Sequence, residues 1–241
     1  MNSVLRKTMV VLVGLMMISV LTGCTNWKKK YTGLSVEHEN LKGRYQMSLA
    51  EKNALAAKVE EDQRMIDDLQ KQMAEGKKVG AATGFGDEFP VEFDAAAGTV
   101  TVTLPDAILF DSGKADLKKS KGLDHVLSVI KEKYSGKMVD VIGNTDADPI
   151  KKSKWTDNWQ LSTERALSVT RYFAGHGIPD NELRAVGRGS SAPIASNTTT
   201  AGKAKNRRVE IVVHIKSQEN AAKLKAAQVV EDSKPAAEQP K

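Results

Sequence analysis

Strand-like and helix-like segments alternate through the second half of the chain, and this alternation restricts the possible folds more than any other feature. The segments with the alternating or short apolar pattern of strands are 99–104, 138–142, 183–186 and 208–215. Two further segments, 114–134 and 159–174, repeat apolar residues every three or four positions, as amphipathic helices do. Because strands alternate with helices, we expect an α+β domain in which a mixed β-sheet is packed by two main helices.

A heptad pattern precedes this domain, over residues 31–75. Its two seam positions hold Tyr31, His38, Tyr45, Lys52, Val59, Ile66 and Met73, and Leu34, Leu41, Ser48, Leu55, Asp62 and Leu69. The pattern predicts a long helical or coiled-coil spacer over 44–75, since Gly33 and Gly43 weaken the first turns. A coiled coil would join copies of the chain into a homo-oligomer. A single extended helix is the alternative, because several seam residues are polar.

The segments on either side of the domain have the composition of linkers. Four glycines lie close together, at Gly76, Gly80, Gly84 and Gly86. They predict a flexible linker over 76–87, so that the globular domain occupies 88–216. After residue 216 the chain is rich in Ala, Lys, Glu and Gln, which predicts a frayed helix running into a disordered tail over 217–241.

The first residues have the pattern of a signal peptide. Two basic residues precede an apolar run over 9–21, which is shorter than the roughly twenty residues of a membrane-spanning helix. The run ends at Leu21-Thr22-Gly23-Cys24, which resembles a bacterial lipobox. That resemblance implies removal of residues 1–23 and attachment of acyl chains at Cys24, leaving 24–43 as a lipidated N-terminal segment. An ordinary secretory signal or anchor helix with a chance cysteine is the alternative.

Composition argues against several classes of protein. Cys24 is the only cysteine, so we expect no disulfide within the chain. A net charge of +6 is weakly basic for this length. The sequence lacks the interleaved basic and aromatic residues of a nucleic-acid surface, so we expect no nucleic-acid partner. The four histidines lack metal-ligand spacing, and residues 187–191 are not a nucleophile elbow. We therefore expect no metal, no cofactor and no enzymatic activity.

Arg165 is the residue whose position on a helix most suggests a site. At about 100° per residue it falls inside the apolar arc of the 159–174 helix, whereas Arg171 lies outside it. A guanidinium there is costly to bury without an anion. The loop after the 138–142 strand offers Asp146. Asp146 and Arg165 together could bind the ammonium and carboxylate groups of a zwitterion. Alternatively, they pair with each other and lock the loop to the helix.

Four runs of the domain resemble the OmpA C-terminal domain family, in the family's order. They are Ile108-Leu109-Phe110-Asp111-Ser112-Gly113, Asn144-Thr145-Asp146, Leu161-Ser162-Thr163-Glu164-Arg165-Ala166 and Asn206-Arg207-Arg208-Val209-Glu210-Ile211. The resemblance implies an OmpA-like fold that binds the diaminopimelate-type peptide stem of peptidoglycan non-covalently. It implies that Asp146 meets the ammonium and Arg165 the α-carboxylate of diaminopimelate. The site residues implied in addition are Phe110, Asp111, Thr145 and Leu161.

The chain departs from the family pattern around the predicted site. Asn144 stands where the family usually has histidine, and Asp148-Pro149 opens a longer, Lys-rich loop over 147–158. Trp155 and Trp159 resemble the MotB branch of the family more than the lipoprotein branch. We interpret the run from Asn206 to Arg208 as structural and leave it out of the site.

These patterns predict a lipoprotein that tethers a membrane to the cell wall. Thr25 follows the cysteine in place of the aspartate associated with inner-membrane retention in enteric bacteria. We therefore expect an outer-membrane lipid anchor facing the periplasm, with the inner membrane as the alternative. A MotB-like stator subunit is another hypothesis, but residues 8–21 hold no ionisable residue for an ion pathway. A coiled-coil assembly component of the envelope is a further one.

Overall fold

The computed structural model describes residues 3–151 and 153–232, with side chains for 27–151, 153–217 and 219–227. The chain divides into two compact units, of which the first ends at Leu55 and the second begins at Ala56. The predicted signal peptide and the Cys24 side chain lie outside the described side chains. Among the described residues, no helix combines the length and the apolar character that a membrane crossing requires.

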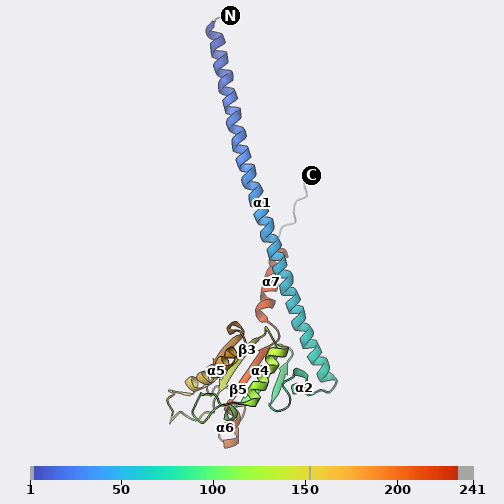
Figure 1. The fold of residues 1–241 in the computed structure, drawn as a ribbon, viewed down its shortest axis with the longest axis vertical. Coiled ribbons are helices and arrows are strands. Elements are labelled where there is room, and N and C mark those ends of the chain that lie inside the picture. The colour runs from blue at the N-terminus through green and yellow to red at the C-terminus, as the bar shows by residue number, and fades with distance from the viewer. Residues whose placement is uncertain (1–2, 152, 233–241) are drawn as a thin grey trace. The chain divides into compact units, whose positions relative to one another are not determined.

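A five-stranded sheet forms the centre of the second unit (Figure 1). The strands are β1 (Val91–Asp94), β2 (Thr99–Pro105), β3 (Met138–Asn144), β4 (Leu183–Gly187) and β5 (Arg208–His214). Their order is β1-β2-β5-β3-β4, and β3 pairs with β4 in parallel while every other pair is antiparallel. The predicted mixed sheet is confirmed. β1, a short edge strand, was not predicted.

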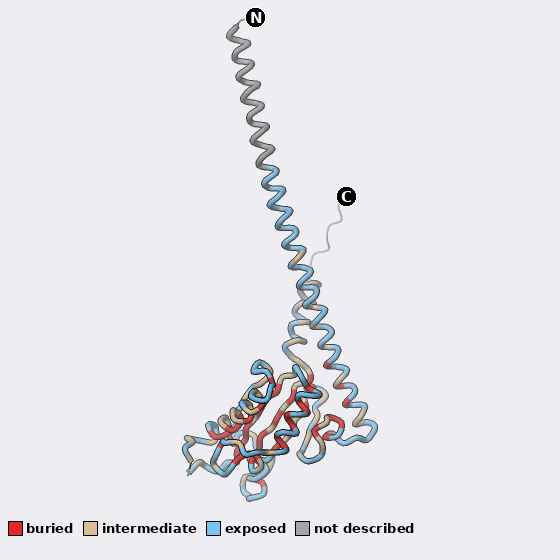
Figure 2. Tube along the Cα trace, in the orientation of Figure 1, coloured by how far each residue is buried: buried red, intermediate tan, exposed pale blue. Residues whose placement is uncertain are grey.

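Two main helices, α4 (Lys121–Lys133) and α5 (Asn158–Gly175), pack on the sheet, as expected from the helical pattern. Alternate residues of β2 are fully buried and join one core with apolar residues of both helices (Figure 2). The predicted helix over 114–134 begins only at Lys121, because the Ser120 hydroxyl accepts a hydrogen bond from the Leu123 N–H and caps it there.

Helix α5 lies directly against β3 and β4, where glycines leave no room for a side chain. A Cβ atom on Gly143 would lie 2.1 Å from the Ser162 carbonyl oxygen. A Cβ atom on Gly187 would lie 2.0 Å from Thr163 Oγ1. These close contacts hold α5, and therefore Arg165, at a fixed height above the ends of the strands.

The long helix α1 (Ser3–Ala74) contains the predicted spacer, but its last turns belong to the second unit. Ile66 and Leu69 are buried in the core of that unit. Asp62 forms an ion pair with Lys137 and accepts a hydrogen bond of 3.2 Å from the Ser217 N–H. The compact unit therefore starts well before the predicted boundary at residue 88, because these seam residues pack on the domain itself.

The segment expected to be a flexible linker, 76–87, is packed instead. It contains the short helix α2 (Val79–Thr83), and Phe85 stacks on Tyr134 with 5.6 Å between ring centroids. The Tyr134 hydroxyl donates to the Thr83 carbonyl at 2.9 Å. A Cβ atom on Gly80 would lie 1.8 Å from the Gly86 carbonyl oxygen, so this glycine permits a tight turn rather than flexibility.

The helix expected after residue 216 is present as α7 (Gln218–Asp232), which covers most of the 217–241 segment expected to be a disordered tail. Its first turn is capped by Ser217, whose hydroxyl accepts from the Asn220 N–H at 3.2 Å. Residues 233–241 lie outside the described part of the chain. Three short helices, α3 (Asp106–Leu109), η1 (Asp180–Glu182) and α6 (Thr200–Asn206), were not predicted.

Candidate functional site

A pocket of about 900 Å³ opens at one end of the sheet. The register explains its position, because Arg208 of β5 lies between Pro105 at the end of β2 and Asn144 at the end of β3. The segments that leave this row of residues therefore meet. They are α3 with its following loop, the loop after β3, and Arg207 just before β5, with α5 completing the wall.

The structure brings all the predicted binding residues to this pocket. Its lining includes Phe110, Asp111, Thr145, Asp146, Leu161 and Arg165. Thr145 and Asp146 are buried, and the Thr145 N–H donates to the Gly189 carbonyl at 2.8 Å, which fixes the backbone where the loop begins. Residues that are far apart in sequence thus share one cavity.

Arg165 is only 3% exposed, on the face of α5 that the helical pattern indicated. Its Nη1 atom lies 3.1 Å from Asp106 Oδ2, and its Nε–H donates to the Lys114 carbonyl at 2.9 Å. The Phe110 ring lies 5.1 Å from the guanidinium carbon. Burial lowers the pKa of Arg165, whereas Asp106 opposes that shift. The side chain is therefore held from two sides by α3 and its loop.

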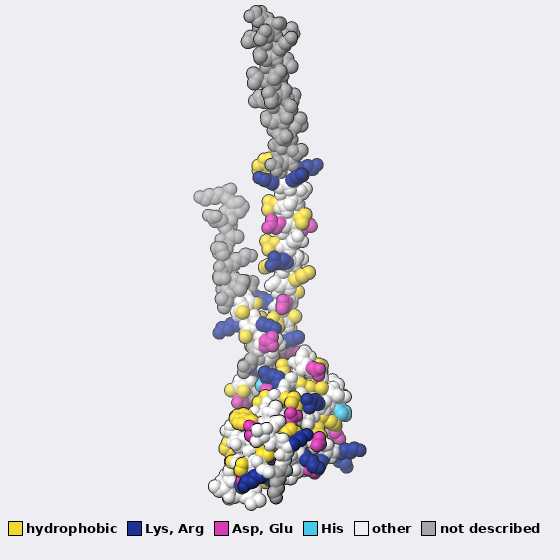
Figure 3. All heavy atoms as spheres, turned by 90° about the vertical axis from the view of Figure 1, so that its left-hand side faces the viewer, with side chains coloured by type: hydrophobic (Ala, Val, Ile, Leu, Met, Phe, Trp, Pro, Cys, Tyr) yellow, Lys and Arg dark blue, Asp and Glu magenta, His cyan; other side chains and the backbone are white. Residues whose placement is uncertain are grey.

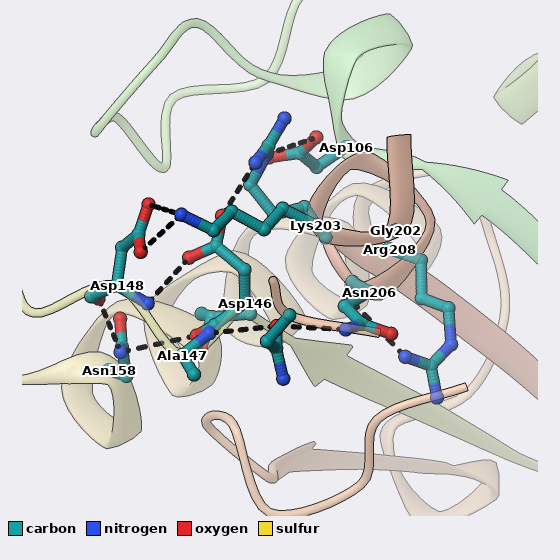
Figure 4. A network of polar contacts seen from close by, with 12 residues as sticks. Asp106, Asp146, Ala147, Asp148, Asn158, Gly202, Lys203, Asn206 and Arg208 are labelled. Carbon is teal, nitrogen blue, oxygen red and sulfur yellow. Dashed lines mark hydrogen bonds and ion pairs between the residues drawn. The ribbon is translucent and has the colours of Figure 1, made fainter. Parts of the chain in front are cut away.

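Asp146 has a different cation as its partner. Arg207 Nη1 lies 2.5 Å from Asp146 Oδ2, and the Asp148 N–H donates to Asp146 Oδ1 at 3.1 Å (Figure 4). The alternative that Asp146 and Arg165 pair with each other is wrong among the described residues, because Asp146 pairs with Arg207 and Arg165 pairs with Asp106.

Asp106 connects the two pairs. Arg207 Nε lies 3.8 Å from Asp106 Oδ1, while Arg165 approaches the other oxygen. The order Arg165, Asp106, Arg207, Asp146 therefore alternates in charge along the pocket wall; we call these four residues the charge chain. Burial raises the pKa of Asp106, and the two neighbouring guanidinium groups oppose that shift.

The long loop after β3 forms one wall of the pocket and is anchored at both ends. The Asn158 side-chain amide donates to the Asp148 carbonyl at 2.9 Å, and Lys203 Nζ lies 2.7 Å from Asp148 Oδ1 (Figure 4). Further along, the Trp155 indole N–H donates to the Gly113 carbonyl at 2.9 Å. The extra residues of this loop are thus part of the pocket wall.

Sequence reasoning missed two members of the charge chain, Asp106 and Arg207. Arg207 was set aside with its neighbours as structural, and those neighbours do stabilise the fold. The Asn206 side chain accepts 2.9 Å bonds from the Ile194 and Ala195 N–H groups, and Arg208 pairs with Glu210 at 2.5 Å. No local pattern marked Arg207, because it lies between α6 and β5 and reaches the pocket through the register of the sheet.

Comparison with known proteins identifies the domain. Residues 109–207 match the OmpA family. The chain contains an OmpA-family domain. This range includes most of the pocket lining, and it confirms the resemblance drawn from the four sequence runs.

The OmpA-family domain has relatives of several kinds. "Probable lipoprotein YiaD" of Escherichia coli is 37% identical over 125 residues, which is 51% of this chain and 55% of that protein. "Peptidoglycan-binding protein ArfA" of Mycobacterium tuberculosis is 51% identical over 57 residues, 24% of this chain and 18% of that protein. A crystal structure of a Desulfovibrio vulgaris protein described as MotB-like has 25% identity and a TM-score of 0.51, covering 68% of this chain and 98% of that one.

The chain spans about half the length of the first curated relatives it matches. The similarity therefore concerns the OmpA-family domain. Within the described residues, no three His, Cys, Asp or Glu side chains are grouped so as to hold a metal ion.

Proposed function

We propose that the pocket binds the peptide stem of peptidoglycan non-covalently, at the zwitterionic end of diaminopimelate. The observation that carries this proposal is the charge chain, which places Arg165 and Asp146 in one cavity with opposite charges. An ammonium and a carboxylate on the same ligand carbon need two such groups. The relative named as peptidoglycan-binding, ArfA, supports the same ligand class.

The contacts already present leave room for a ligand on both groups. Arg165 uses Nε and Nη1 for Lys114 and Asp106, so the proposal assigns the remaining edge of its guanidinium to the ligand carboxylate. The Asp146 carboxylate, which already pairs with Arg207, accepts a hydrogen bond from the ligand ammonium in this proposal. Charged hydrogen bonds contribute roughly 1.5–3 kcal/mol each, and micromolar affinity needs about 8 kcal/mol. A few such contacts with apolar packing therefore suffice, without catalysis.

The other predicted residues form the walls of the proposed site. Phe110 and Leu161 offer buried apolar surface to the aliphatic part of diaminopimelate. Thr145 precedes Asp146 and its hydroxyl donates to the Asp146 carbonyl at 2.9 Å, which fixes the start of the loop. Asp111 lies at the rim, where Lys114 Nζ is 3.2 Å away.

We propose that the protein is a lipoprotein, anchored at Cys24 after removal of residues 1–23. The lipobox-like run and the similarity to YiaD, whose name describes a lipoprotein, support this assignment. Two or three acyl chains hold a protein firmly on a membrane, since each buried methylene contributes about 0.8 kcal/mol. The protein would then tether the outer membrane to the wall from its periplasmic side. The inner membrane is the alternative.

A MotB-like stator role is the second candidate, favoured by the likeness to the MotB-like structure. A stator needs a membrane span with an ionisable residue, and residues 8–21 contain none. Globomycin treatment of cells separates the two roles. Accumulation of a longer precursor supports the lipoprotein, whereas an unchanged full-length chain favours the stator.

The first unit supports a proposal of self-association through the spacer. Among the described side chains of α1, the seam residues Tyr31, Leu34, Leu41 and Tyr45 are exposed, and hydrophobic side chains are visible on this helix between charged ones (Figure 3). Beyond residue 60 the seam residues of the heptad pattern pack on the domain, so a coiled coil would be confined to the part of α1 before that residue. Sedimentation equilibrium of residues 27–232 against 56–232 tests this, with an oligomer expected only for the longer chain.

Co-sedimentation with purified peptidoglycan tests the main proposal. We expect the wild-type chain to sediment with the wall and Arg165→Ala to stay in solution. Arg171→Ala is the matched control, because it removes an exposed arginine from the same helix. Equal sedimentation of all three proteins would refute the assignment of Arg165. A wild-type chain that remains in solution would refute wall binding itself.

A further inference from the structure

The residues that line the pocket include four carboxylates and four cations, and two further lysines that pair with these carboxylates from outside the lining add positive charge. The lining carboxylates are Asp106, Asp111, Asp146 and Asp148. The cations that line it or pair with those carboxylates are Lys114, Lys118, Lys151, Arg165, Lys203 and Arg207. Six cations stand against four carboxylates, an excess of two positive charges at neutral pH. A zwitterion is neutral and leaves this excess unchanged, whereas a ligand with a further carboxylate reduces it.

Lys151 differs from the other cations of the pocket. Lys118 lies 3.8 Å from Asp111 and donates to the Ala107 carbonyl at 2.6 Å, and the two arginines belong to the charge chain. Lys151 is exposed, lines the pocket, and has no ion pair or hydrogen bond with any other residue that the structure describes. Its ammonium is therefore available to a ligand without displacing an existing partner.

The loop that carries Lys151 is anchored on both sides of it. Asp148 is tied to Asn158 and Lys203, and Trp155 is tied to Gly113. Lys154, in the same loop, lies over the Trp155 ring with its Nζ 4.5 Å from the ring centre and does not line the pocket. Of the described lysines in this loop, Lys151 is thus the one that faces the cavity.

We propose that Lys151 binds a second carboxylate of the ligand, so that the pocket selects a stem peptide with net negative charge. This inference rests on the proposed function, in which diaminopimelate occupies the charge chain. The second carboxylate is the one carried by the stem residue next to diaminopimelate, which walls contain either as the free acid or as the amide. Amidation removes the charge with little change of shape, so the proposal concerns specificity between two closely similar ligands.

Calorimetric titration of the full chain in detergent with two synthetic peptides tests the proposal. Both peptides are alanyl-glutamyl-diaminopimelate, one with the glutamate α-carboxylate free and the other with it amidated. We expect the free acid to bind about five- to tenfold more tightly. This factor corresponds to a contribution from Lys151 that lies between that of an exposed ion pair and that of a charged hydrogen bond. The preference should decrease with added salt, because Lys151 is exposed.

Three variants assign the preference to Lys151. Lys151→Gln should bind both peptides equally, with the affinity that the wild type has for the amide. Lys151→Arg keeps the charge and should keep the preference. Lys154→Gln is the matched control, because it removes the same charge from the same loop outside the pocket, and it should also keep the preference.

The outcomes separate this proposal from the function on which it rests. Equal binding of the two peptides by the wild type would overturn the selectivity and leave stem binding intact. A preference that persists in Lys151→Gln would overturn the role of this residue. Failure of both peptides to bind the wild type would overturn the proposed function together with the inference.

Discussion

Replacing Phe85 with alanine tests whether the glycine-rich segment 76–87 is a structural part of the domain. The Phe85 ring is 1% exposed and stacks on Tyr134. Truncation of a buried phenylalanine to alanine typically removes about 3–5 kcal/mol of stability, through lost transfer energy and the cavity left behind. We expect a loss of about 3–4 kcal/mol here, because the neighbouring helix α2 is short and can relax only partly into the space.

Urea unfolding of the full chain, followed by tryptophan fluorescence, measures this loss. In thermal unfolding, each kcal/mol corresponds to about 2–4 °C in a unit of this size, so the Tm should fall by roughly 6–16 °C. Ile194→Ala is the control, since Ile194 is 60% exposed and its truncation should change stability by less than about 0.5 kcal/mol. If Phe85→Ala behaved like Ile194→Ala, the segment would be the flexible linker that its glycines first suggested.

Three further substitutions test the packing around the pocket and the sheet. Gly143→Ala should destabilise the domain by about 2–3 kcal/mol and weaken wall binding, because the new methyl group would push α5 and Arg165 away from β3. Asn144→Val should stabilise it by about 1 kcal/mol, since both polar atoms of this buried amide lack a hydrogen-bond partner in the described structure. Asp140→Asn should be less stable than the wild type at neutral pH, with a difference that shrinks below the ordinary carboxyl pKa of 3.8.

The pH dependence of the last variant follows from the environment of Asp140. Burial acts to raise the pKa of Asp140, but hydrogen bonds from His214 and Arg184 outweigh burial and lower it. A carboxyl group with a lowered pKa stabilises the fold above its unfolded value and loses that contribution as the pH falls through the folded value. Unfolding free energies at pH 7 and pH 3 measure this effect.

Each of these three predictions has an outcome that contradicts it. Normal stability of Gly143→Ala would mean that α5 can shift without loss. A destabilised Asn144→Val would mean that the Asn144 amide has a favourable role. If the difference in unfolding free energy between Asp140→Asn and the wild type stayed constant from pH 7 to pH 3, the ionised Asp140 carboxylate would not be the cause of that difference.

Local patterns were enough to predict four of the five strands of the sheet and the position of α5. β2, β5 and α5 each bury one face against the core, so their apolar periodicity is visible in the sequence itself. Arg165 stood out for the same reason, as a charge inside an apolar arc. The sequence runs shared with the OmpA family then indicated Asp146 and the wall residues, which the structure places in one pocket.

The partners of these residues were decided only by the tertiary structure. An apolar stripe on a helix does not specify what covers it, so Ile66 and Leu69 could equally have met another helix. Glycines permit both flexible linkers and tight turns, so the packing of 76–87 depended on where Phe85 finds Tyr134. Asp106 and Arg207 joined the charge chain because the register of β2, β3 and β5 aligns their ends, a long-range relation that no local pattern contains.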